Sequence, residues 1–581
     1  MLACSQTCKY LHALVSSSSA LQYSLALSAT GTYDGPASLP LSTSERLSLL
    51  QTRRKSWRTL TLNEPAASIH LPGNCQAYDL VGGYYGKCAG PADTESDSLE
   101  PGERRSITLV TLPSNNPRRE AGIETYDLGV QIKDFAMDPS QDLIAFLEMP
   151  RQDGRVRLHM RRLSEPGAAH PLASVGVLEG SAGRFVRECM VDIAEDVVAL
   201  YARELGPRVI IFNWRTGEEL VNMQPPHHDV PPHDFSFVSP RAFLLTYAHT
   251  DAIRLFSFST TSPSNSKSKT LDVTSTLRLP PPAVGARFLG LNTLTGPWLA
   301  RAPPHSAYHP ANARRVHTFC LTVEDIEGMW HELMLVVPGS ALVGIIQAAL
   351  WRPSIFPRLP ALVGERASGE DEKGRMVGWD KWITKEARVV PMAQAFEWQR
   401  YVHGARMLAR GTAGLHLFDF DVPVKDGERD KWRDARMFAR GSVSVFESGE
   451  RGVLVEGILH VGRNRGRSQS RGSEAGRTGD GENDGGEDDG TEWAENLVID
   501  EVAAMNQSHQ PLIDIPRPPP LQEDGEQELF SSLPYGCVCV PVPEVPKDGR
   551  GGVYTGFMLD EQRLVGVRSV ADGEVLDVWT F

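Results

Sequence analysis

The feature that most limits the fold of this 581-residue chain is a long series of short β-rich runs. They begin near Leu60, and Gly, Pro, Asn or Asp residues separate one run from the next. The clearest runs are Ile107–Leu112, Asp142–Met149, Arg155–Met160, Val197–Tyr201, Arg208–Trp214, Phe243–Tyr247, Ile253–Phe258, Val316–Val323, Leu415–Phe420, Val443–Phe446, Val538–Val542, Phe557–Leu559, Arg563–Val567 and Val575–Phe581. Many short strands broken by turn residues are typical of a sandwich, a barrel or a propeller.

A weak internal repeat favours the propeller among these three. Residues 132–159, 189–217 and 233–258 share one layout: a polar or acidic start, an apolar strand, a turn and a second strand. Their spacing is close to that of propeller blades, roughly 40–50 residues. The turn Asn213–Glu218 is similar to the end of a WD-type blade, although the Gly-His and Trp-Asp dipeptides are missing there. We therefore predict a mainly β chain with a propeller-like (WD-type) domain.

The N-terminal part has a different, helical pattern. In residues 1–27, apolar side chains recur at helical spacing, interrupted by the serines at 16–19. A second helix is expected after Ser42, because Ser-Thr-Ser-Glu provides capping side chains ahead of an apolar run.

These patterns divide the chain into three regions. Residues 1–27 and a helical linker at 28–60 precede a propeller-like β domain at 61–581. Three insertions are too polar to bury much apolar surface, so we expect them to be disordered: 89–106, 259–270 and 463–495.

The stretch Leu333–Trp351 carries no charged residue and has about the length of a membrane span. Pro338 and Gly339 interrupt it, so we interpret it as a strand, Glu332–Val337, followed by a buried helix from Ser340. We expect no membrane contact. The eight cysteines show neither a disulfide framework nor zinc-finger spacing, and the N-terminus lacks a secretory pattern. A cytoplasmic or nuclear protein is therefore expected.

Charge and motifs argue against several functions. The formal net charge of −14 disfavours nucleic acid as a partner, and we interpret the basic runs Arg53–Lys55 and Arg314–Arg315 as solvated faces. No nucleophile elbow, phosphate loop, dinucleotide fingerprint or His-Glu-x-x-His motif occurs. We predict a protein that is not an enzyme and uses no cofactor.

The best candidate for metal ligands is a Pro-rich stretch with His227, His228, Asp229, His233 and Asp234. Loops between strands commonly collect these residue types, so we predict no metal site.

A dense group of aromatic residues allows two interpretations. Trp379, Trp382, Trp398 and Tyr401 could pack between blades, or they could form a recognition surface, since Trp and Tyr are enriched at binding hot spots.

Several stretches resemble one known family. Residues 2–23 look like the second half of an F-box, and residues 33–60 are similar to the region that follows it in a large group of fungal F-box proteins. Later motifs fit the same group in the same order: residues 132–143, Trp-Asp-Lys-Trp at 379–382, Tyr-Val-His-Gly-Ala-Arg at 401–406 and Leu-Pro-Tyr at 533–535.

This resemblance implies the substrate-recognition subunit of a Skp–cullin–F-box ubiquitin ligase. The helical remnant would bind a Skp-type adaptor, and the β domain would present a target protein. The residues that would form the adaptor-facing or internal face are Leu2, Cys8, Tyr10, Leu11, Leu14 and Val15. F-boxes usually begin with Leu-Pro and a first helix, which are absent here, so adaptor binding is expected to be weak or lost.

Two other functions remain open. One is a protein-binding propeller scaffold with no link to ubiquitin. The other, a hydrolase with a propeller cleft, is disfavoured because no nucleophile–base pair is visible.

Overall fold

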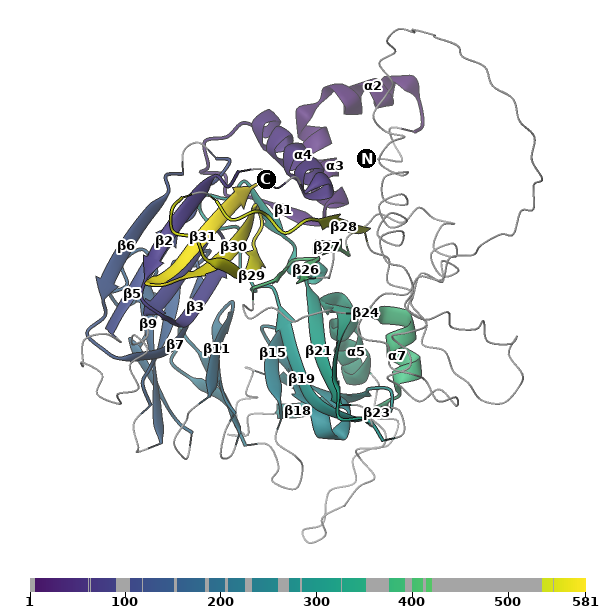
Figure 1. The fold of residues 1–581 in the computed structure, drawn as a ribbon. Coiled ribbons are helices and arrows are strands. Elements are labelled where there is room, and N and C mark those ends of the chain that lie inside the picture. The colour runs from purple at the N-terminus through teal and green to yellow at the C-terminus, as the bar shows by residue number, and fades with distance from the viewer. Residues whose placement is uncertain are drawn as a thin grey trace, which may run out of the picture.

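A computed structural model shows a seven-bladed β-propeller with a helical module at the N-terminal end (Figure 1). It describes residues 6–60, 62, 64–89, 105–116, 119–150, 154–182, 188–203, 207–224, 232–259, 271–282, 285–324, 327–351, 376–391, 400–410, 414–420, 536–546 and 548–581. The described helices are α2 (Lys9–Ser17), α3 (Ser19–Ala29), α4 (Thr43–Thr59), α5 (Gly339–Trp351), α7 (Trp379–Glu386) and the short 3₁₀ helices η2 (Ala248–Thr250) and η3 (Asn312–Arg314).

The first four blades are antiparallel sheets whose strands follow chain order from the inside of the ring to the outside. Blade 1 is β3 (Cys75–Val81), β4 (Tyr84–Ala89), β5 (Ser106–Thr111) and β6 (Gly122–Asp127). Blade 2 is β7 (Ile132–Asp138), β8 (Leu143–Glu148), β9 (Arg155–Arg162) and β10 (Val177–Ser181). Blade 3 is β11 (Cys189–Ala194), β12 (Val197–Ala202), β13 (Arg208–Asn213) and β14 (Glu219–Met223). Blade 4 is β15 (Asp234–Ser239), β16 (Ala242–Tyr247), β17 (Ala252–Phe258) and β18 (Leu271–Arg278), with the parallel strand β23 (Met376–Val377) added outside.

The remaining blades complete the ring. Blade 5 is β19 (Arg287–Thr295), β21 (Val316–Glu324), β22 (Trp330–Pro338) and β24 (Arg388–Pro391). Blade 6 is β25 (Val402–His403), β26 (Arg406–Arg410), β27 (Leu415–Asp419) and β28 (Gly536–Val540). Blade 7 is β29 (Val553–Leu559), β30 (Arg563–Val570), β31 (Gly573–Thr580) and, from the other end of the chain, β2 (Ala67–Pro72).

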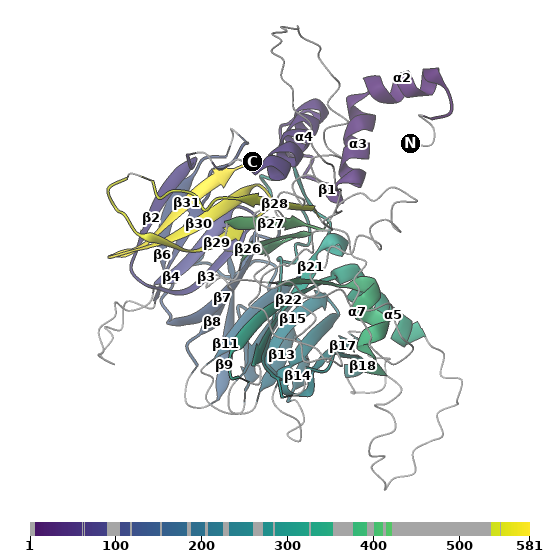
Figure 2. The same ribbon diagram turned by 45° about the vertical axis from the view of Figure 1, so that its right-hand side comes forward.

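Blade 7 closes the ring because it combines both ends of the domain. Strand β2 pairs antiparallel with the last strand, β31, so that Ala67 lies opposite Val578 (Figure 2). This pairing joins the two ends of the domain within one sheet, in which β2 is the outermost strand.

The hydrophobic core lies between neighbouring blades. One cluster of buried residues fills each of the boundaries 1–2, 2–3, 3–4, 4–5 and 7–1, and a larger cluster spans blades 5, 6 and 7. The second strands of blades 3 and 4, β12 and β16, bury every residue, because both faces of each sheet pack against another blade. This explains why their sequences are continuous apolar runs rather than alternating ones.

The predicted repeat is confirmed. Its three segments begin at the inner strands of blades 2, 3 and 4, namely β7, β11 and β15. Trp214, in the turn that resembles a WD-type blade end, is fully buried and meets the His170 ring edge-on at 4.8 Å. Since His170 belongs to blade 2 and Trp214 to blade 3, the aromatic residue fills the layer between blades as expected.

Two helical predictions are also confirmed. Helix α4 has a capping box in which the Ser42 hydroxyl accepts a hydrogen bond from the Glu45 amide and the Glu45 carboxylate accepts one from the Ser42 amide. The apolar stretch at 333–351 is strand β22 followed by α5, as predicted. The helix is buried on one face only: Leu342 and Ile346 pack in the cluster between blades 4 and 5, whereas Leu350 is 57% exposed. No described helix is long and apolar enough to span a membrane.

Other predicted features lie outside the described residues. These are Leu2, Trp398, the run Val443–Phe446, residues 90–104 and 260–270 of two insertions and all of 463–495. The helical region ends at Thr59, and the first propeller strand begins at Ala67.

Candidate functional site

The N-terminal helical module is held together by a polar network that joins the buried Arg46 and Tyr23 to the exposed Asp34. Arg46, 6% exposed, forms an ion pair with Asp34 at 2.8 Å and also donates to the carbonyl oxygens of Pro36 and Leu39. The Tyr23 hydroxyl donates to the same Asp34 carboxylate at 2.8 Å. Helices α3 and α4 and strand β1 (Thr32–Asp34) are thereby fixed to one another.

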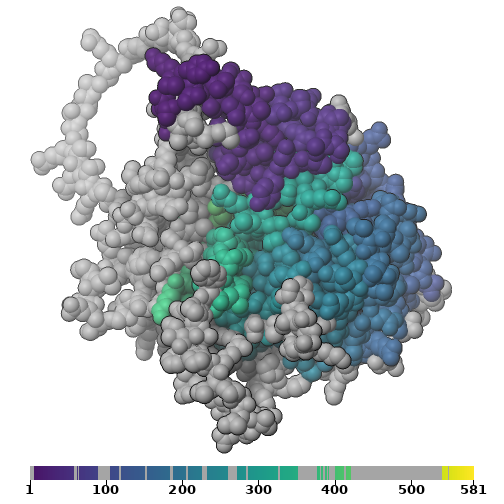
Figure 3. Space-filling model, turned by 180° about the vertical axis from the view of Figure 1, so that it is seen from behind, coloured from purple at the N-terminus to yellow at the C-terminus, as the bar shows by residue number. Residues whose placement is uncertain are grey.

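An insertion in blade 5, residues 296–315, attaches this module to the propeller. It contains β20 (Tyr308–Pro310), which pairs antiparallel with β1. The same insertion crosses the end of the ring where the inner hairpins turn. The Trp298 indole donates to Glu195 of blade 3, and Arg301 donates to the carbonyl oxygen of Ser140 in blade 2 at 2.6 Å. The module therefore rests on a segment that several blades support (Figure 3).

Helix α4 contacts the propeller directly through two buried side chains. The Trp57 ring lies 4.5 Å from that of Phe581, the last residue of the chain. Arg53 forms an ion pair with Glu561 of blade 7 and stacks 4.3 Å from the centre of the Tyr308 ring. The prediction that Arg53–Lys55 is a solvated face is wrong for Arg53, which is only 2% exposed.

The second basic run needs the same correction. Arg315 is 3% exposed, stacks over Trp298 and donates to the carbonyl oxygen of Phe237. The aromatic rings and carbonyl oxygens that accommodate Arg53 and Arg315 come from distant parts of the chain, so a local run of basic residues does not reveal them.

The predicted adaptor-facing residues divide between two faces of α2. Val15 is buried and Leu11 half-buried, whereas Tyr10 is 74% and Leu14 48% exposed. Cys8, just before the helix, is exposed as well. Tyr10 and Leu14 are four residues apart, so they form one apolar patch. Figures 1 and 2 show α2 at the outer end of the module, away from the blades.

The inner strands of blades 1 to 4 all carry an aspartate near their start or middle: Asp79, Asp134, Asp192 and Asp234. Strand β7 carries a second one, Asp138, which accepts from Ser140 and Gln141 in the turn that follows. Three of these carboxylates accept a hydrogen bond from the main chain of the following blade. These bonds come from the amides of Met137, Val191 and Thr293 to Asp79, Asp134 and Asp234, at 2.9, 3.0 and 2.8 Å respectively. The aspartates thus connect consecutive inner strands around the ring.

The four aspartates have different electrostatic surroundings. Asp79 is paired with Arg400, whose Nη2 lies 2.6 Å from the Asp79 carboxylate. Burial raises the pKa of Asp134 to about 7 and that of Asp234 to about 6, because water is excluded and main-chain amides compensate only in part. Burial also raises the pKa of Asp192, against the effect of Arg400 and Arg315.

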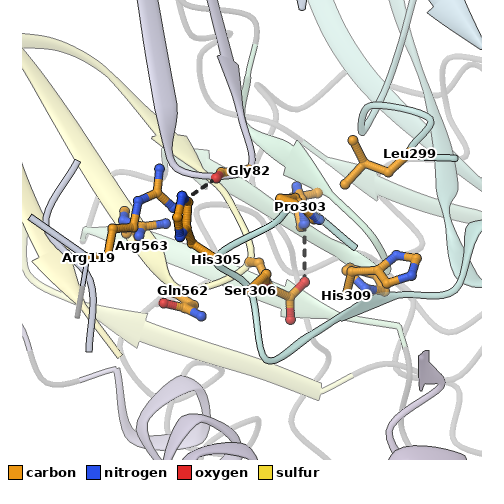
Figure 4. A pocket seen from close by; sticks show the side chains of 12 residues that line it. Gly82, Arg119, Leu299, Pro303, His305, Ser306, His309, Gln562 and Arg563 are labelled. Carbon is orange, nitrogen blue, oxygen red and sulfur yellow. Dashed lines mark hydrogen bonds and ion pairs between the residues drawn. The ribbon is translucent and has the colours of Figure 1, made fainter. Parts of the chain in front are cut away.

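Figure 4 shows a pocket at the end of the ring that the blade 5 insertion crosses. It is lined by Gly82 and Arg119 of blade 1, His305 and His309 of the insertion, and Gln562 and Arg563 of blade 7. Its cavity volume is about 10 Å³, close to the space that a single water molecule needs. This pocket is far too small for a nucleotide or another small-molecule substrate, which need pockets of about 300–1,000 Å³.

The wall of this pocket depends on the two-residue turn Gly82-Gly83 between β3 and β4. Both residues have positive φ angles, +57° and +79°, as a type I′ hairpin turn requires. A Cβ atom on Gly83 would lie 2.5 Å from Nη1 of Arg119 and 2.7 Å from Nη1 of Arg563. The two guanidinium groups therefore meet above a residue that has no side chain.

Gly83→Ala is expected to lower the free energy of unfolding by more than Gly129→Ala does. Both substitutions place alanine at positive φ, which costs about 1–3 kcal/mol, but an added Cβ at Gly129 would meet nothing within 4 Å. Urea denaturation of both variants measures the difference. Equal losses would show that the arginines move aside without cost.

The aromatic residues predicted as either packing or recognition groups do not form one cluster. Trp382 is buried between blades 4 and 5, where its indole donates to the carbonyl oxygen of Arg278 at 2.9 Å, and Trp379 is half-buried beside it. Tyr401 is buried in the cluster of blades 5 to 7. The structure thus places the three described residues in packing positions.

The histidine-rich stretch lies largely outside the described residues. His233 is described, and its ring lies 3.1 Å from Nη2 of Arg203. Burial and this neighbouring cation lower the pKa of His233 to about 4. Within the described part of the chain, no three His, Cys, Asp or Glu side chains are grouped as metal ligands.

The chain has little similarity to known proteins in sequence. No protein-family model matches the sequence. No curated protein matches it either. Solved structures that are similar include Hsv2 of Kluyveromyces lactis at 8% identity (TM-score 0.25, 35% of this chain, 62% of that chain) and the same protein with loop 6CD replaced by a Gly-Ser linker at 12% identity (TM-score 0.25, 46% of this chain, 71% of that chain). The match covers less than two thirds of the first Hsv2 chain. The seven-bladed fold therefore rests on the strand pairing of this chain itself.

Proposed function

We propose that this protein is a non-enzymatic, protein-binding propeller scaffold that uses α2 to recruit a Skp-type adaptor and so acts as the substrate-recognition subunit of a ubiquitin ligase. The observation that carries the proposal is the apolar patch of Tyr10 and Leu14 on α2. Solvent-exposed aromatic and aliphatic side chains on a helix are typical of surfaces that pack against another helix.

The way α2 is supported favours this function. Helix α2 is followed directly by α3, and α3 is fixed through Asp34 and Arg46 to β1, which pairs with β20. A partner bound at α2 would therefore have a defined orientation relative to the blades, as a subunit that presents a target requires. The blades would supply the surface for the target protein.

A binding measurement with the full chain and a purified Skp-type adaptor tests the proposal. We expect the wild type to bind weakly, and Tyr10→Ser combined with Leu14→Ser to lower the affinity at least about tenfold further, since each buried apolar side chain contributes about 1.5–3 kcal/mol. Leu172→Ser is the matched control, because Leu172 is equally apolar and 59% exposed but lies on blade 2.

Absence of adaptor binding by the wild type would contradict the ligase function. Association with other proteins but never with the adaptor or a cullin would then favour a scaffold without a link to ubiquitin. Equal binding by the wild type and the α2 variant would place the adaptor site elsewhere.

A further inference from the structure

Two guanidinium groups in the pocket of Figure 4 have donors without a protein partner. Arg119 Nε and Arg563 Nη2 are both buried and donate to no acceptor among the described residues. Arg563 as a whole is only 2% exposed. A buried charged donor that lacks an acceptor costs free energy, so such a group points to a ligand that supplies one.

The other donors of these two arginines fix their position. Arg119 donates to the carbonyl oxygens of Gly82 and Gly83 at 3.1 and 2.8 Å and stacks on the Tyr84 ring. Arg563 donates to the carbonyl oxygen of Pro113 and forms an ion pair with Asp560 at 2.8 Å. These contacts hold both guanidinium groups next to Gly83 and fix the position of the donors that have no partner.

The local charge balance is positive. Asp560 neutralises one of the two arginines, while the nearby Glu561 is already shared by Arg53 and His403. Burial, and to a lesser extent the charge of Arg563, lower the pKa of Arg119 to about 10. Partial burial and the charge of Arg119 also lower the pKa of His305.

We propose that Arg119 and Arg563, with His305 at the rim, bind one small oxyanion group, a carboxylate or a phosphate, with a single oxygen seated in the pocket. The cavity admits one oxygen atom and no larger group. Guanidinium nitrogens are the donors that recognise carboxylate and phosphate oxygens most effectively in proteins. The site lies on blades 1 and 7 and the blade 5 insertion, so it is separate from the α2 patch.

The test uses the full chain with inorganic phosphate and with acetate as separate probes, each at constant ionic strength set with chloride. Thermal unfolding and calorimetric titration are expected to show saturable binding by the wild type. Arg119→Gln is expected to weaken it at least about tenfold, because one of the two cations is lost. Arg301→Gln is the matched control: Arg301 lies in the same insertion but contacts Ser140 and not the pocket.

Saturation by both probes supports an oxyanion site, and tighter binding of phosphate would identify a phosphorylated group rather than an acidic side chain as the natural ligand. No wild-type effect beyond that of chloride, or equal binding by Arg119→Gln, overturns the proposal. If Arg119→Gln does not fold, two milder variants test the site. Arg119→Lys keeps the positive charge, and His305→Ala removes only an exposed ring. Both are expected to weaken binding, and wild-type affinity in both would overturn the site.

Discussion

Asp79→Asn is expected to lower the free energy of unfolding by about 3–5 kcal/mol, because it leaves the charge of Arg400 without its partner. Asp79 is 1% exposed and accepts from Nε and Nη2 of Arg400 at 2.9 and 2.6 Å. The amide of Met137 also donates to Asp79, so the substitution weakens the contact between blades 1 and 2 as well. Urea denaturation at pH 7 measures the loss.

Asp134→Asn is the matched control for this prediction. Asp134 has the same role toward the main chain, accepting from the amide of Val191 at 3.0 Å, but it has no ion pair with a described residue. Asparagine keeps a carbonyl oxygen for that amide and removes the half-buried charge. We therefore expect no loss of stability at pH 7, or a small gain.

The pH dependence of stability also distinguishes the protonation of Asp134 from its role as a hydrogen-bond acceptor. Burial raises the pKa of Asp134 from an ordinary 3.8 to about 7, so between these two values the folded protein holds a proton that the unfolded chain has released. The contribution of Asp134 to stability is therefore complete below pH 4 and declines as the pH rises to 7. Asp134→Asn lacks this decline. The free energy of unfolding of the variant, minus that of the wild type, should therefore increase as the pH rises from 4 to 7.

Equal losses in Asp79→Asn and Asp134→Asn would contradict this account. They would show that the aspartates act only as acceptors for the next blade and that the ion pair with Arg400 adds no net stability. A pH-independent difference between Asp134→Asn and the wild type would show that Asp134 is solvated in solution.

The sequence predicts those parts of the fold that depend on neighbouring residues. The strands of blades 2, 3 and 4 follow from apolar runs between turn residues, and the cap of α4 follows from Ser42 and Glu45, three positions apart. The polar start of each repeat contains Asp134, Asp192 or Asp234, so the pattern marks the inner strands. The sequence does not show that Asp134 and Asp234 accept hydrogen bonds from the following blade, because those amides come from distant parts of the chain.

The pocket and the attachment of the helical module could not be predicted in this way. Arg53 and its partner Glu561 lie near opposite ends of the sequence. The pocket residues Arg119, His305 and Arg563 likewise come from three separate regions of the sequence. No local pattern distinguishes such arginines from solvated ones, because their partners are set by ring closure. The signal that did exist was the Gly82-Gly83 pair, since adjacent glycines indicate a tight turn or the close approach of another group.

Trp57→Ala is expected to lower the free energy of unfolding of the helical module by about 3–5 kcal/mol, the usual cost of removing a large buried aromatic side chain. Trp57 is 2% exposed, and its ring packs on that of Phe581. The Cζ atom of Arg406 lies 5.2 Å from the centre of the Trp57 ring, and the indole nitrogen donates to the carbonyl oxygen of Glu561. One side chain thus joins α4 to blades 6 and 7. Trp330→Ala is the control, with an expected change within about 0.5 kcal/mol, because Trp330 is 70% exposed.

Limited proteolysis distinguishes loss of this attachment from loss of the whole fold. If Trp57 mainly anchors α4, its alanine variant should be cut between α4 and β2 at protease concentrations that leave the wild type intact, while blades 1 to 6 remain resistant. Cleavage throughout the propeller would instead mean that α4 supports the closure of blade 7, since β2 follows α4 directly and completes that sheet. An intact Trp57→Ala protein would show that the ion pair of Arg53 with Glu561 and the pairing of β1 with β20 suffice to hold the module, and α2 would then keep its orientation without Trp57.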